Sequence, residues 1–502
     1  MGAMSTWKVW ITGVFLAVFL TDRLTNAIAF RRENITTTLG PQLSNGAQII
    51  LPHNAGFVQA TQRWSLFDPP HFTAVVEVGT EEDIATTVKF ANKNNIPFLA
   101  VTGSHGTIAC LGKFNGIEIR MRKLNSTVIS EDGKTATFGG GKRSGEVIEA
   151  LWAAGKQTVS GICECTGFLG PALGGGHGVL QGKYGIASDQ FVSMRMVTAD
   201  GAIREVSSSG PNSDLWWAMQ GAGHNFGIVT SITSKVYDVP DGGLWSYETY
   251  VFSYDKVEAV FETINWLAQH QPPGMFNRDV IYRNPSVDPK NPILQVDLLQ
   301  ESVSAVAPNF TSPFRKLGPM SVGSGSGTYK DIPKWTGVNF NSIACNVADT
   351  SKIRFPIGLV SYNATAQQAL MDTFSQVIGP DSPFNVSQVL FEGYSMYGVK
   401  AVPDNATAFP HRGDNQLVTV AMVNAPRPEL DAQAVRIGNK LRQVLLEGSG
   451  STELHAYVNY AAGTESLQNL YGFEPWRLKR LKELKAKYDP QDRFGYYAPI
   501  PV

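Results

Sequence analysis

The chain has 502 residues, of which 43% are hydrophobic and 17% charged, and its 42 basic and 43 acidic residues nearly cancel. This length exceeds that of one ordinary core, so we expect two domains, or three. The balanced charge argues against a nucleic-acid-binding surface, and any bound phosphate must be held mainly by backbone donors.

Residues 1–29 have the pattern of a secretory signal peptide. Lys8 precedes an apolar run at 9–20, and Ala27 and Ala29 supply an Ala-x-Ala cleavage pattern. The run is short for a membrane span, so we expect no stable span after cleavage; a single N-terminal anchor is the alternative. Asn-x-Ser/Thr sequons support entry into the secretory pathway, with the mature protein secreted or vesicular. The predicted glycosylation sites are Asn34, Asn125, Asn309, Asn363, Asn385 and Asn405.

The elements expected in the first half are short and alternate between strand and helix. The predicted strands are 73–78, 97–101, 116–121, 135–138, 191–198, 203–206 and 227–239, and the predicted helices are 81–95, 144–154 and 214–220. The turn Pro-Asp-Gly-Gly at 240–243 suggests a domain boundary.

Beyond this boundary the elements become longer and glycine clusters cease. The predicted strands are 245–253, 415–423 and 454–460, and the predicted helices are 254–270, 430–447 and 475–487. Small alternating elements followed by longer strands and helices indicate an α+β fold.

The stretch GICECTGFLGPALGGGHG at 161–178 combines many glycines with two cysteines. Backbone N–H groups in such a run can form an anion-binding concavity, which predicts a phosphorylated ligand. Further glycine-rich turns lie at 103–106 and 139–141, and several loops converging on one extended ligand suit a dinucleotide. Tight turns in a strand-rich fold are the alternative. The spacing fits neither a P-loop nor a G-x-G-x-x-G fingerprint.

Four cysteines, Cys110, Cys163, Cys165 and Cys345, are too few for a disulfide scaffold in a chain of this length. The Cys-x-Cys spacing of Cys163 and Cys165 also differs from the ligand spacing of structural zinc sites, and we expect no metal.

Four motifs occur in order along the chain. They are VTGSH at 101–105; CECTG at 163–167 leading to GGG at 174–176; DLWWA at 214–218 with GAGHNFGIV at 221–229; and YVNY at 457–460 with YDP at 488–490. In these motifs the chain resembles FAD-linked oxidoreductases of the vanillyl-alcohol-oxidase type, and more narrowly the berberine-bridge-enzyme-like group and its fungal oxygen-dependent members. The resemblance implies an FAD-binding PCMH-type domain at 69–240, an inserted α+β substrate domain at 241–453, and a berberine-bridge-like segment at 454–502 that returns to the FAD domain.

The resemblance further implies FAD bound covalently to His105 through the flavin 8α-methyl group. A neutral imidazole nitrogen is a competent nucleophile, and the flanking Gly103 and Gly106 allow a close approach. Cys163 falls where some relatives form a second bond, to flavin C6. The alternatives are a Cys163–Cys110 disulfide, or a Cys165–Cys110 disulfide that leaves Cys163 free, because Cys-Glu-Cys departs from the family's common Cys-Pro-Thr.

Other residues that match the family's motifs are expected to bind FAD. Thr166 lies where the family controls oxygen access, and its valine-like shape predicts reaction with molecular oxygen and release of hydrogen peroxide. A dehydrogenase that uses another acceptor is the alternative. The expected FAD-binding residues besides His105 and Cys163 are Thr102, Gly103, Ser104, Gly106, Thr166, Gly167, Gly170, Gly174, Gly175, Gly176, Gly178, Gly227, Ile228, Val229 and Asn459.

Tyr457 and Tyr460 are the candidate catalytic residues. On a regular strand they would face opposite sides, one toward the flavin and one toward the core. In carbohydrate-oxidising relatives, the tyrosine that matches Tyr460 removes the hydroxyl proton while hydride passes to the flavin. A phenol with a pKa of about 10 needs a neighbouring cation or hydrogen bond for this task, and the sequence does not name that partner.

Residues 419–422 decide between substrate classes. Relatives often place polar active-site groups on this strand, whereas Thr419, Val420, Ala421 and Met422 form an apolar face here. This departure favours a small hydrophobic substrate, aromatic or polyketide-like, and the leading hypothesis is an FAD-linked oxidase that dehydrogenates or oxidatively cyclises such a compound in secondary-metabolite biosynthesis. The alternatives are a secreted oligosaccharide oxidase, favoured by the leader and the sequons, and a flavin-containing cyclase without net redox chemistry.

Overall fold

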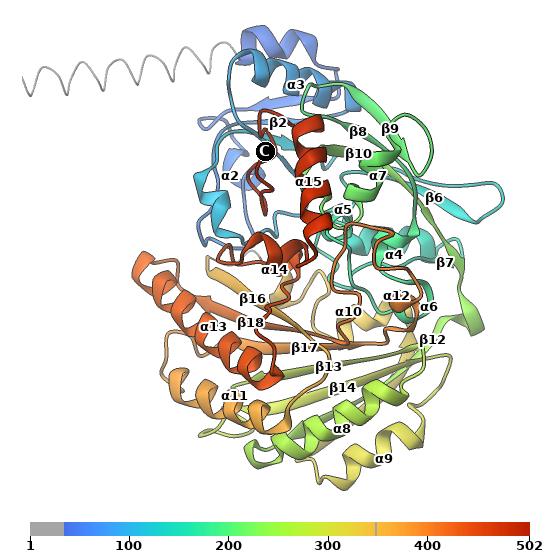
Figure 1. Ribbon diagram of the computed structural model, residues 1–502, viewed down its shortest axis with the longest axis vertical. Coiled ribbons are helices and arrows are strands. Elements are labelled where there is room, and N and C mark those ends of the chain that lie inside the picture. The colour runs from blue at the N-terminus through green and yellow to red at the C-terminus, as the bar shows by residue number, and fades with distance from the viewer. Residues whose placement is uncertain (1–34, 347–348) are drawn as a thin grey trace, which may run out of the picture.

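Three larger sheets and a two-stranded ribbon organise residues 35–346 and 349–502, the parts of the chain that this computed structural model describes (Figure 1). The predicted signal peptide and Asn34 lie outside the described residues. The α+β prediction is confirmed.

The first sheet has four strands in the order β1-β2-β4-β3, with β2, β4 and β3 parallel and β1 antiparallel at the edge. Its strands are β1 Gln48–Ile50, β2 His71–Glu77, β3 Phe98–Val101 and β4 Asn115–Arg120. Helix α3, Glu81–Lys93, begins after Thr80, whose side chain accepts a hydrogen bond from the Asp83 N–H. This cap fixes the start of the helix, and its apolar face packs on the sheet in a separate hydrophobic core.

The second sheet is antiparallel, with the strand order β5-β6-β10-β8-β9. Its strands are β5 Thr127–Ile129, β6 Thr135–Gly139, β8 Phe191–Val197, β9 Ile203–Ser207 and β10 Ile228–Lys235, with helices α4 Ser144–Trp152 and α7 Ser213–Met219 nearby in sequence. The prediction of one strand at 227–239 is wrong. β10 ends at Lys235 because its partner β6 starts opposite, at Thr135, and Tyr237–Asp238 (β11) instead pairs with β7, Lys156–Gln157.

The third sheet is antiparallel and has seven strands in the order β15-β12-β14-β13-β17-β18-β16. The strands are β12 Leu244–Phe252, β13 Met275–Tyr282, β14 Ile293–Glu301, β15 Ser321–Thr328, β16 Ser351–Leu359, β17 Gln388–Tyr394 and β18 Gln416–Asn424. Helices α8 Val257–His270, α11 Ala364–Val377 and α13 Pro428–Ser449 cover the face that points away from the first two sheets (Figure 1). The opposite face is therefore free to meet the first part of the chain.

Shorter helices connect these layers. They are α2 Phe57–Ala60, α5 Leu169–Leu173, α6 Gln181–Tyr184, α9 Pro308–Lys316, α10 Ile332–Trp335, α12 Tyr397–Lys400 and α14 Leu467–Tyr471. The predicted boundary at 240/241 falls in a short helical turn, Pro240–Gly243, between β11 and β12, and the domain limits stay a prediction.

The C-terminal segment packs against the first part of the chain, as the resemblance implied (Figure 1). Helix α15, Pro475–Tyr488, sends Lys485 Nζ to the Asn225 carbonyl, 3.3 Å away. The Ile500 N–H donates to Asn225 Oδ1 at 2.8 Å, and the Tyr471 hydroxyl donates to the Ala498 carbonyl at 2.6 Å. The side chain of Asn225 is fully buried, so the tail completes this core.

Five predicted glycosylation sites lie among the described residues, and all five asparagines are exposed: Asn125, Asn309, Asn363, Asn385 and Asn405. Asn363 also caps α11 by accepting a hydrogen bond from the Ala366 N–H at 3.2 Å. Glycosylation itself stays a prediction. Across residues 35–346 and 349–502, we find no helix with both the length and the apolar character that a membrane crossing requires.

Candidate active site

Four side chains from distant parts of the chain form a continuous stack. The His105 ring lies on Trp64, with centroids 5.2 Å apart and planes 19° from parallel. The guanidinium carbon of Arg354 is 4.6 Å from the Trp64 ring centroid and 4.7 Å from the Tyr460 ring centroid. The stack thus brings His105 and Tyr460, which belong to separate sequence motifs, to one site.

His105 lies in a tight turn that holds its ring in place. Ser104 has a φ of 57°, a left-handed conformation that is uncommon outside glycine, and the His105 Nδ1 lies 2.6 Å from the Gly103 carbonyl. Because a carbonyl can only accept, Nδ1 carries the proton and Nε2 keeps its lone pair. Burial, helped by the neighbouring charges of Arg354 and Arg63, lowers the pKa of His105 to about 3, so the imidazole is neutral at pH 7.

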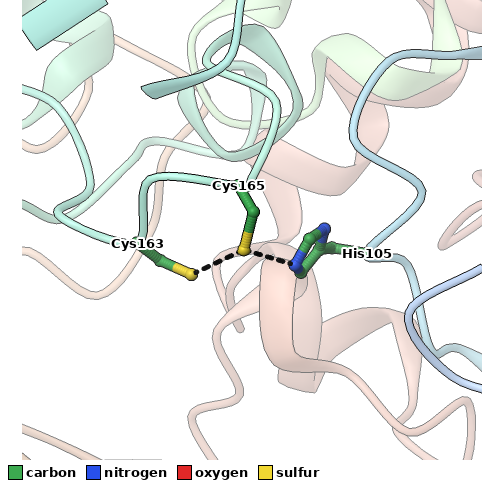
Figure 2. A group of neighbouring side chains, drawn as sticks. All are labelled: His105, Cys163 and Cys165. Carbon is green, nitrogen blue, oxygen red and sulfur yellow. Dashed lines mark hydrogen bonds between the residues drawn. The ribbon is translucent and has the colours of Figure 1, made fainter. Parts of the chain in front are cut away.

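Cys163 and Cys165 lie beside this histidine (Figure 2). The cysteine pairing differs from both predicted alternatives. Cys165 forms a disulfide with Cys345, and Cys163 and Cys110 are free. The predicted pairings with Cys110 are therefore wrong, because the chain folds Cys110 away toward the Tyr496 carbonyl, 3.3 Å from its sulfur. The Cys165 Sγ is 3.4 Å from His105 Nε2 and 3.7 Å from Cys163 Sγ. Burial raises the pKa of the Cys163 thiol, while Thr166 and Arg354 oppose that rise.

The turns that carry His105 and Cys163 touch each other through glycine. A Cβ at Gly103 would lie 2.4 Å from the Gly167 nitrogen, and one at Gly167 would lie 3.2 Å from the Thr102 side chain. The Thr102 hydroxyl donates to the Gly140 carbonyl at 3.1 Å, which ties the third glycine-rich turn to the same place. These contacts bring the glycine-rich turns at 103–106, 139–141 and 167–178 together, and their convergence on one ligand stays a prediction.

The rest of the stretch 161–178 leads from the cysteines to the C-terminal motif. Gly175 and Gly176 have φ values of 106° and 83°, which favour glycine, and a Cβ at Gly174 would lie 2.5 Å from Asn459 Oδ1. Asn459 Nδ2 donates to the Pro171 carbonyl at 2.8 Å. A Cβ at Gly170 would meet no heavy atom within 4 Å.

Five further predicted binding residues occupy tightly packed positions. A Cβ at Gly106 would lie 3.1 Å from Tyr497, one at Gly178 would lie 2.3 Å from the Ser160 carbonyl oxygen, and one at Gly227 would lie 2.1 Å from Met196. The Ile228 and Val229 side chains are buried in two different hydrophobic cores. These residues can offer a ligand only their backbone, and their binding role stays a prediction.

The strand predicted at 454–460 is wrong, and with it the opposite orientation of the two tyrosines. Val458–Tyr460 forms a 3-10 turn, in which residues three apart share a side, and the rings of Tyr457 and Tyr460 pack with centroids 5.2 Å apart. The Tyr457 hydroxyl accepts the His177 N–H at 3.3 Å, and burial raises the Tyr457 pKa to about 12. Of these two tyrosines, only Tyr460 forms a hydrogen bond with an acidic side chain.

That partner is Glu392 on β17, which the sequence did not reveal. The Tyr460 hydroxyl donates to Glu392 Oε2 at 3.0 Å, and the Tyr394 hydroxyl donates to Glu392 Oε1 at 2.7 Å. Burial raises the pKa of the Glu392 carboxyl, and burial beside Glu392 raises the pKa of Tyr460 well above its usual value, an effect that Arg354 opposes. The sequence feature that could have revealed Glu392 is its position as the one acidic residue in the largely apolar strand sequence QVLFEGY.

The apolar face predicted at 419–422 is correct only in part. Val420 and Met422 point into the core under the helices, so they do not face the site. Cross-strand partners share a face, and Ala421 lies opposite Arg354 on β16, while Leu417 lies opposite Glu392 on β17. The neighbouring strands therefore supply the charged groups that β18 lacks.

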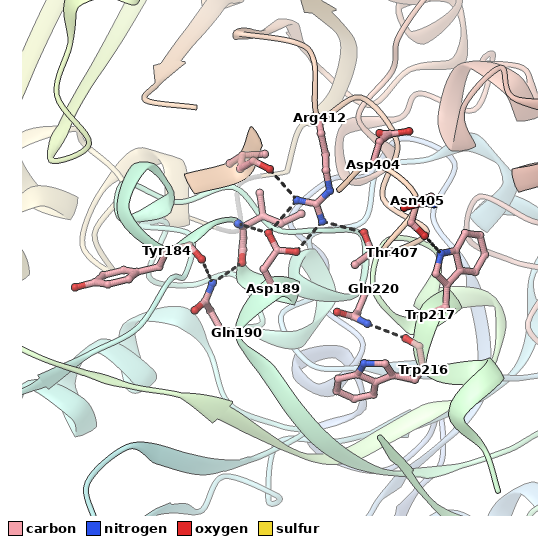
Figure 3. Close-up of polar contacts among 12 residues, drawn as sticks. Tyr184, Asp189, Gln190, Trp216, Trp217, Gln220, Asp404, Asn405, Thr407 and Arg412 are labelled. Carbon is pink, nitrogen blue, oxygen red and sulfur yellow. Dashed lines mark hydrogen bonds and ion pairs between the residues drawn. The ribbon is translucent and has the colours of Figure 1, made fainter. Parts of the chain in front are cut away.

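A cavity lies next to Tyr457. Its lining includes Glu392, Tyr457 and His177, the apolar side chains of Phe409 and Leu417, and further polar residues such as Asp414. A buried ion pair fixes the loop that carries Phe409: Arg412 Nη2 lies 2.7 Å from Asp189 Oδ1 and 2.9 Å from the Thr407 hydroxyl (Figure 3).

Comparison with known proteins identifies the family. Residues 72–207 match the FAD binding domain family, and residues 456–501 match the berberine and berberine-like family. The chain is 44% identical over 467 residues to the FAD-linked oxidoreductase chyH of Penicillium rubens, covering 92% of this chain and 93% of the relative. It is also 44% identical over 479 residues to the FAD-linked oxidoreductase chry5 of Gibberella zeae, covering 92% and 94%. The chain belongs to the berberine-bridge-enzyme-like FAD-linked oxidoreductases.

The same architecture occurs in solved structures. Glucooligosaccharide oxidase from Acremonium strictum, whose flavin is described as 6-S-cysteinyl, 8α-N1-histidyl FAD, superposes with a TM-score of 0.78 at 20% identity, covering 93% of this chain and 99% of that one. At this identity the similarity shows the fold.

The residues of this FAD-linked oxidoreductase fit FAD. The turns at 103–106 and 161–178 meet at Gly103 and Gly167 without an intervening side chain, so the backbone itself forms this surface. A neutral imidazole and a free thiol border the same region, both within 4 Å of Cys165 Sγ. Thr102–Gly106 and Cys163–Gly178 would hold the cofactor, with Tyr460 on the opposite side of the stack.

Proposed function

We propose that the protein is an oxidase that dehydrogenates a hydroxyl group or activated C–H bond of a small hydrophobic metabolite, or cyclises it oxidatively, with oxygen as the final acceptor. The observation that carries this proposal is the Tyr460–Glu392 hydrogen bond. The ring of Tyr460 belongs to the same stack of side chains as His105. A proton acceptor thereby faces the residues that fit the flavin.

When bound by Thr102–Gly106 and Cys163–Gly178, FAD would supply a two-electron acceptor for the hydride of the substrate carbon, and its reoxidation by oxygen would give hydrogen peroxide. The chain's own residues handle the proton. Tyr460 removes the proton of a substrate hydroxyl and passes its own proton to Glu392 Oε2, so that a carbonyl forms as the hydride departs. Tyr394 holds the other carboxyl oxygen and fixes its orientation.

The proposal includes two covalent bonds to the flavin, from His105 to the 8α-methyl group and from Cys163 to C6. Both positions lie on the benzenoid ring, and His105 Nε2 and Cys163 Sγ border the same sulfur atom. Intact mass with peptide mapping tests this directly, because both peptides should carry flavin mass. His105→Ala and Cys163→Ala should each keep flavin through acid precipitation, and the double variant should release it. Complete release from the unaltered protein would contradict covalent attachment.

The oxygen reaction is proposed from Thr166, whose backbone N–H is bonded to the Cys163 carbonyl at 3.2 Å next to the site. The protein, reduced with dithionite and mixed with oxygen, should reoxidise rapidly and release peroxide, and Thr166→Leu should slow this step. Slow reoxidation of the unaltered protein would favour a dehydrogenase that uses another acceptor.

The substrate is proposed to be hydrophobic because Phe409 and Leu417 line the cavity, with a place in secondary metabolism. An oligosaccharide oxidase is the second candidate, favoured by the polar residues of the cavity lining, which include Asp414. Peroxide release on a panel of oligosaccharides would support the second candidate and exclude the first. Product formation without anaerobic loss of flavin colour would instead favour a cyclase without net redox chemistry.

The protein is further proposed to enter the secretory pathway and to carry glycans. The exposure of Asn125, Asn309, Asn363, Asn385 and Asn405 supports this. A mass decrease of the purified protein after glycosidase treatment is the expected result, and an unchanged mass would contradict glycosylation.

A further inference from the structure

Arg354 differs from three buried arginines that form ion pairs. Arg412 pairs with Asp189, Arg442 with Glu465 and Arg477 with Asp404. Across the described ranges, the Arg354 side chain has no ion pair and no hydrogen bond, and it packs on the rings of Trp64 and Tyr460. A guanidinium group has five N–H donors in a planar fork, so this fork is left for something else.

The two rings hold the guanidinium group in place. Trp64 is itself fixed, because its Nε1 donates to the Ala344 carbonyl at 2.7 Å and its own carbonyl accepts from Lys352 Nζ at 2.6 Å. Tyr460 is fixed by Glu392. The Arg354 side chain is only partly buried, so a ligand can reach part of it. Such a preoriented fork loses little further freedom when it binds a planar anion.

The surroundings of Arg354 carry an excess of positive charge. Lys352 Nζ lies over the same Trp64 ring, 4.8 Å from its centroid. Arg63 Nη2 donates a hydrogen bond to the Gly106 carbonyl at 2.9 Å. The carboxyl group of the site, Glu392, is occupied by the hydroxyls of Tyr460 and Tyr394. An anion at Arg354 would therefore meet several cations and no competing carboxylate partner.

We propose that Arg354 binds a carboxylate of the substrate, so that the metabolite oxidised here is a hydrophobic acid. This inference rests on the proposed function, because it places the substrate in the site of Tyr460. The carboxylate would pair with the fork as Asp189 pairs with Arg412, with two parallel N–H···O bonds. Since Arg354 lies over the Tyr460 ring, the anchored acid has its reacting end within reach of the Tyr460 hydroxyl.

Ligand binding to the purified holoprotein tests the proposal without knowledge of the substrate. Benzoate and benzamide have the same shape and differ in charge, and each is titrated while the visible flavin spectrum is followed. Benzoate should bind roughly 10- to 100-fold more tightly than benzamide, as expected for charge-assisted hydrogen bonds. Arg354→Gln should abolish this preference and leave benzamide binding unchanged. The matched control is Arg436→Gln, which alters an exposed arginine of α13.

The following results would overturn the proposal or separate it from the proposed function. Equal binding of the two probes, or failure of benzoate to bind the unaltered yellow protein, overturns the proposal even if Arg354→Gln does not fold. If Arg354→Gln lowers the affinity of the flavin for sulfite but keeps the preference for benzoate, Arg354 serves the flavin and the proposal is wrong. Arg354→Lys, which keeps the charge without the fork, should retain part of the preference. A colourless protein would refute the proposed function itself, which separates that failure from this one.

Discussion

The two sides of the site are built by different means. The side that fits the flavin consists of turns at 102–106 and 161–178, where glycine and backbone groups determine the shape. The opposite side consists of strands β16 and β17 and the turn at Tyr460, where the side chains Arg354 and Glu392 determine the charge. We infer that the first side sets which cofactor is held, and that the second sets which substrate reacts.

The largest expected effect comes from the substrate side. Tyr460→Phe and Glu392→Gln should each slow anaerobic flavin reduction by about 10²- to 10⁴-fold with any substrate that reduces the unaltered protein, because proton removal is lost. Stopped-flow absorbance measures this rate. Tyr254→Phe, which removes a tyrosine–carboxylate hydrogen bond to Asp372 far from the site, is the control. Unchanged rates of flavin reduction in both Tyr460→Phe and Glu392→Gln would mean that these residues do not remove the substrate proton.

The next effect concerns the buried ion pair of Arg412 and Asp189, which fixes the loop of Phe409 beside the cavity. Arg412→Met leaves Asp189 buried without its partner and should lower the free energy of unfolding by about 3–5 kcal/mol. Arg412→Met combined with Asp189→Leu should recover much of this loss, because no buried charge remains. Chemical denaturation of the variants measures both values. An equal loss in the double variant would show that packing, rather than charge, is responsible.

A smaller effect is expected from the disulfide between Cys165 and Cys345, which links the flavin side to the segment before β16. Cys345→Ser should lower the free energy of unfolding by about 2–4 kcal/mol, because the unfolded chain gains freedom. Cys110→Ser removes a free cysteine and should change stability much less. If the two variants are equally stable, the disulfide does not contribute in this way.

The mildest effect is a change in the pH dependence of flavin reduction. Burial raises the pKa of Glu392, so the carboxyl group keeps its proton to higher pH than a free glutamate. The reduction rate should therefore increase with pH through an apparent pKa above about 4.3, the value for free glutamate. The residual rate of flavin reduction in Glu392→Gln should not show this increase with pH. If the rate of the variant increases with pH in the same way as that of the unaltered protein, the titrating group is not Glu392.

The difference between the two sides also explains what the sequence could predict. The turn of His105, the stretch that contains Cys163 and the convergence of the glycine-rich loops follow from local motifs, in which residue order reflects backbone geometry. Most predicted strands and helices were found for the same reason, since period-2 and period-3.6 patterns are local. The prediction for 454–460 failed because YVNY carries the alternation of a strand but folds as a 3-10 turn.

The substrate side could not be read in the same way. Glu392 meets Tyr460 across 68 residues, and Trp64 meets Arg354 only when β16 takes its place at the edge of the third sheet. The cysteine pairing failed similarly, since Cys165 and Cys345 are 180 residues apart. Such contacts depend on strand order, which no local pattern in this chain specifies.

The tail that docks on Asn225 has a consequence for how the protein is made. Ile500 completes the hydrogen bonds of a residue synthesised 275 positions earlier. At about 5–20 residues per second, the ribosome leaves this core incomplete for tens of seconds. Unfinished chains therefore expose apolar surface during that time, and a stop codon within the last few residues would leave a buried amide unsatisfied rather than merely shorten the protein.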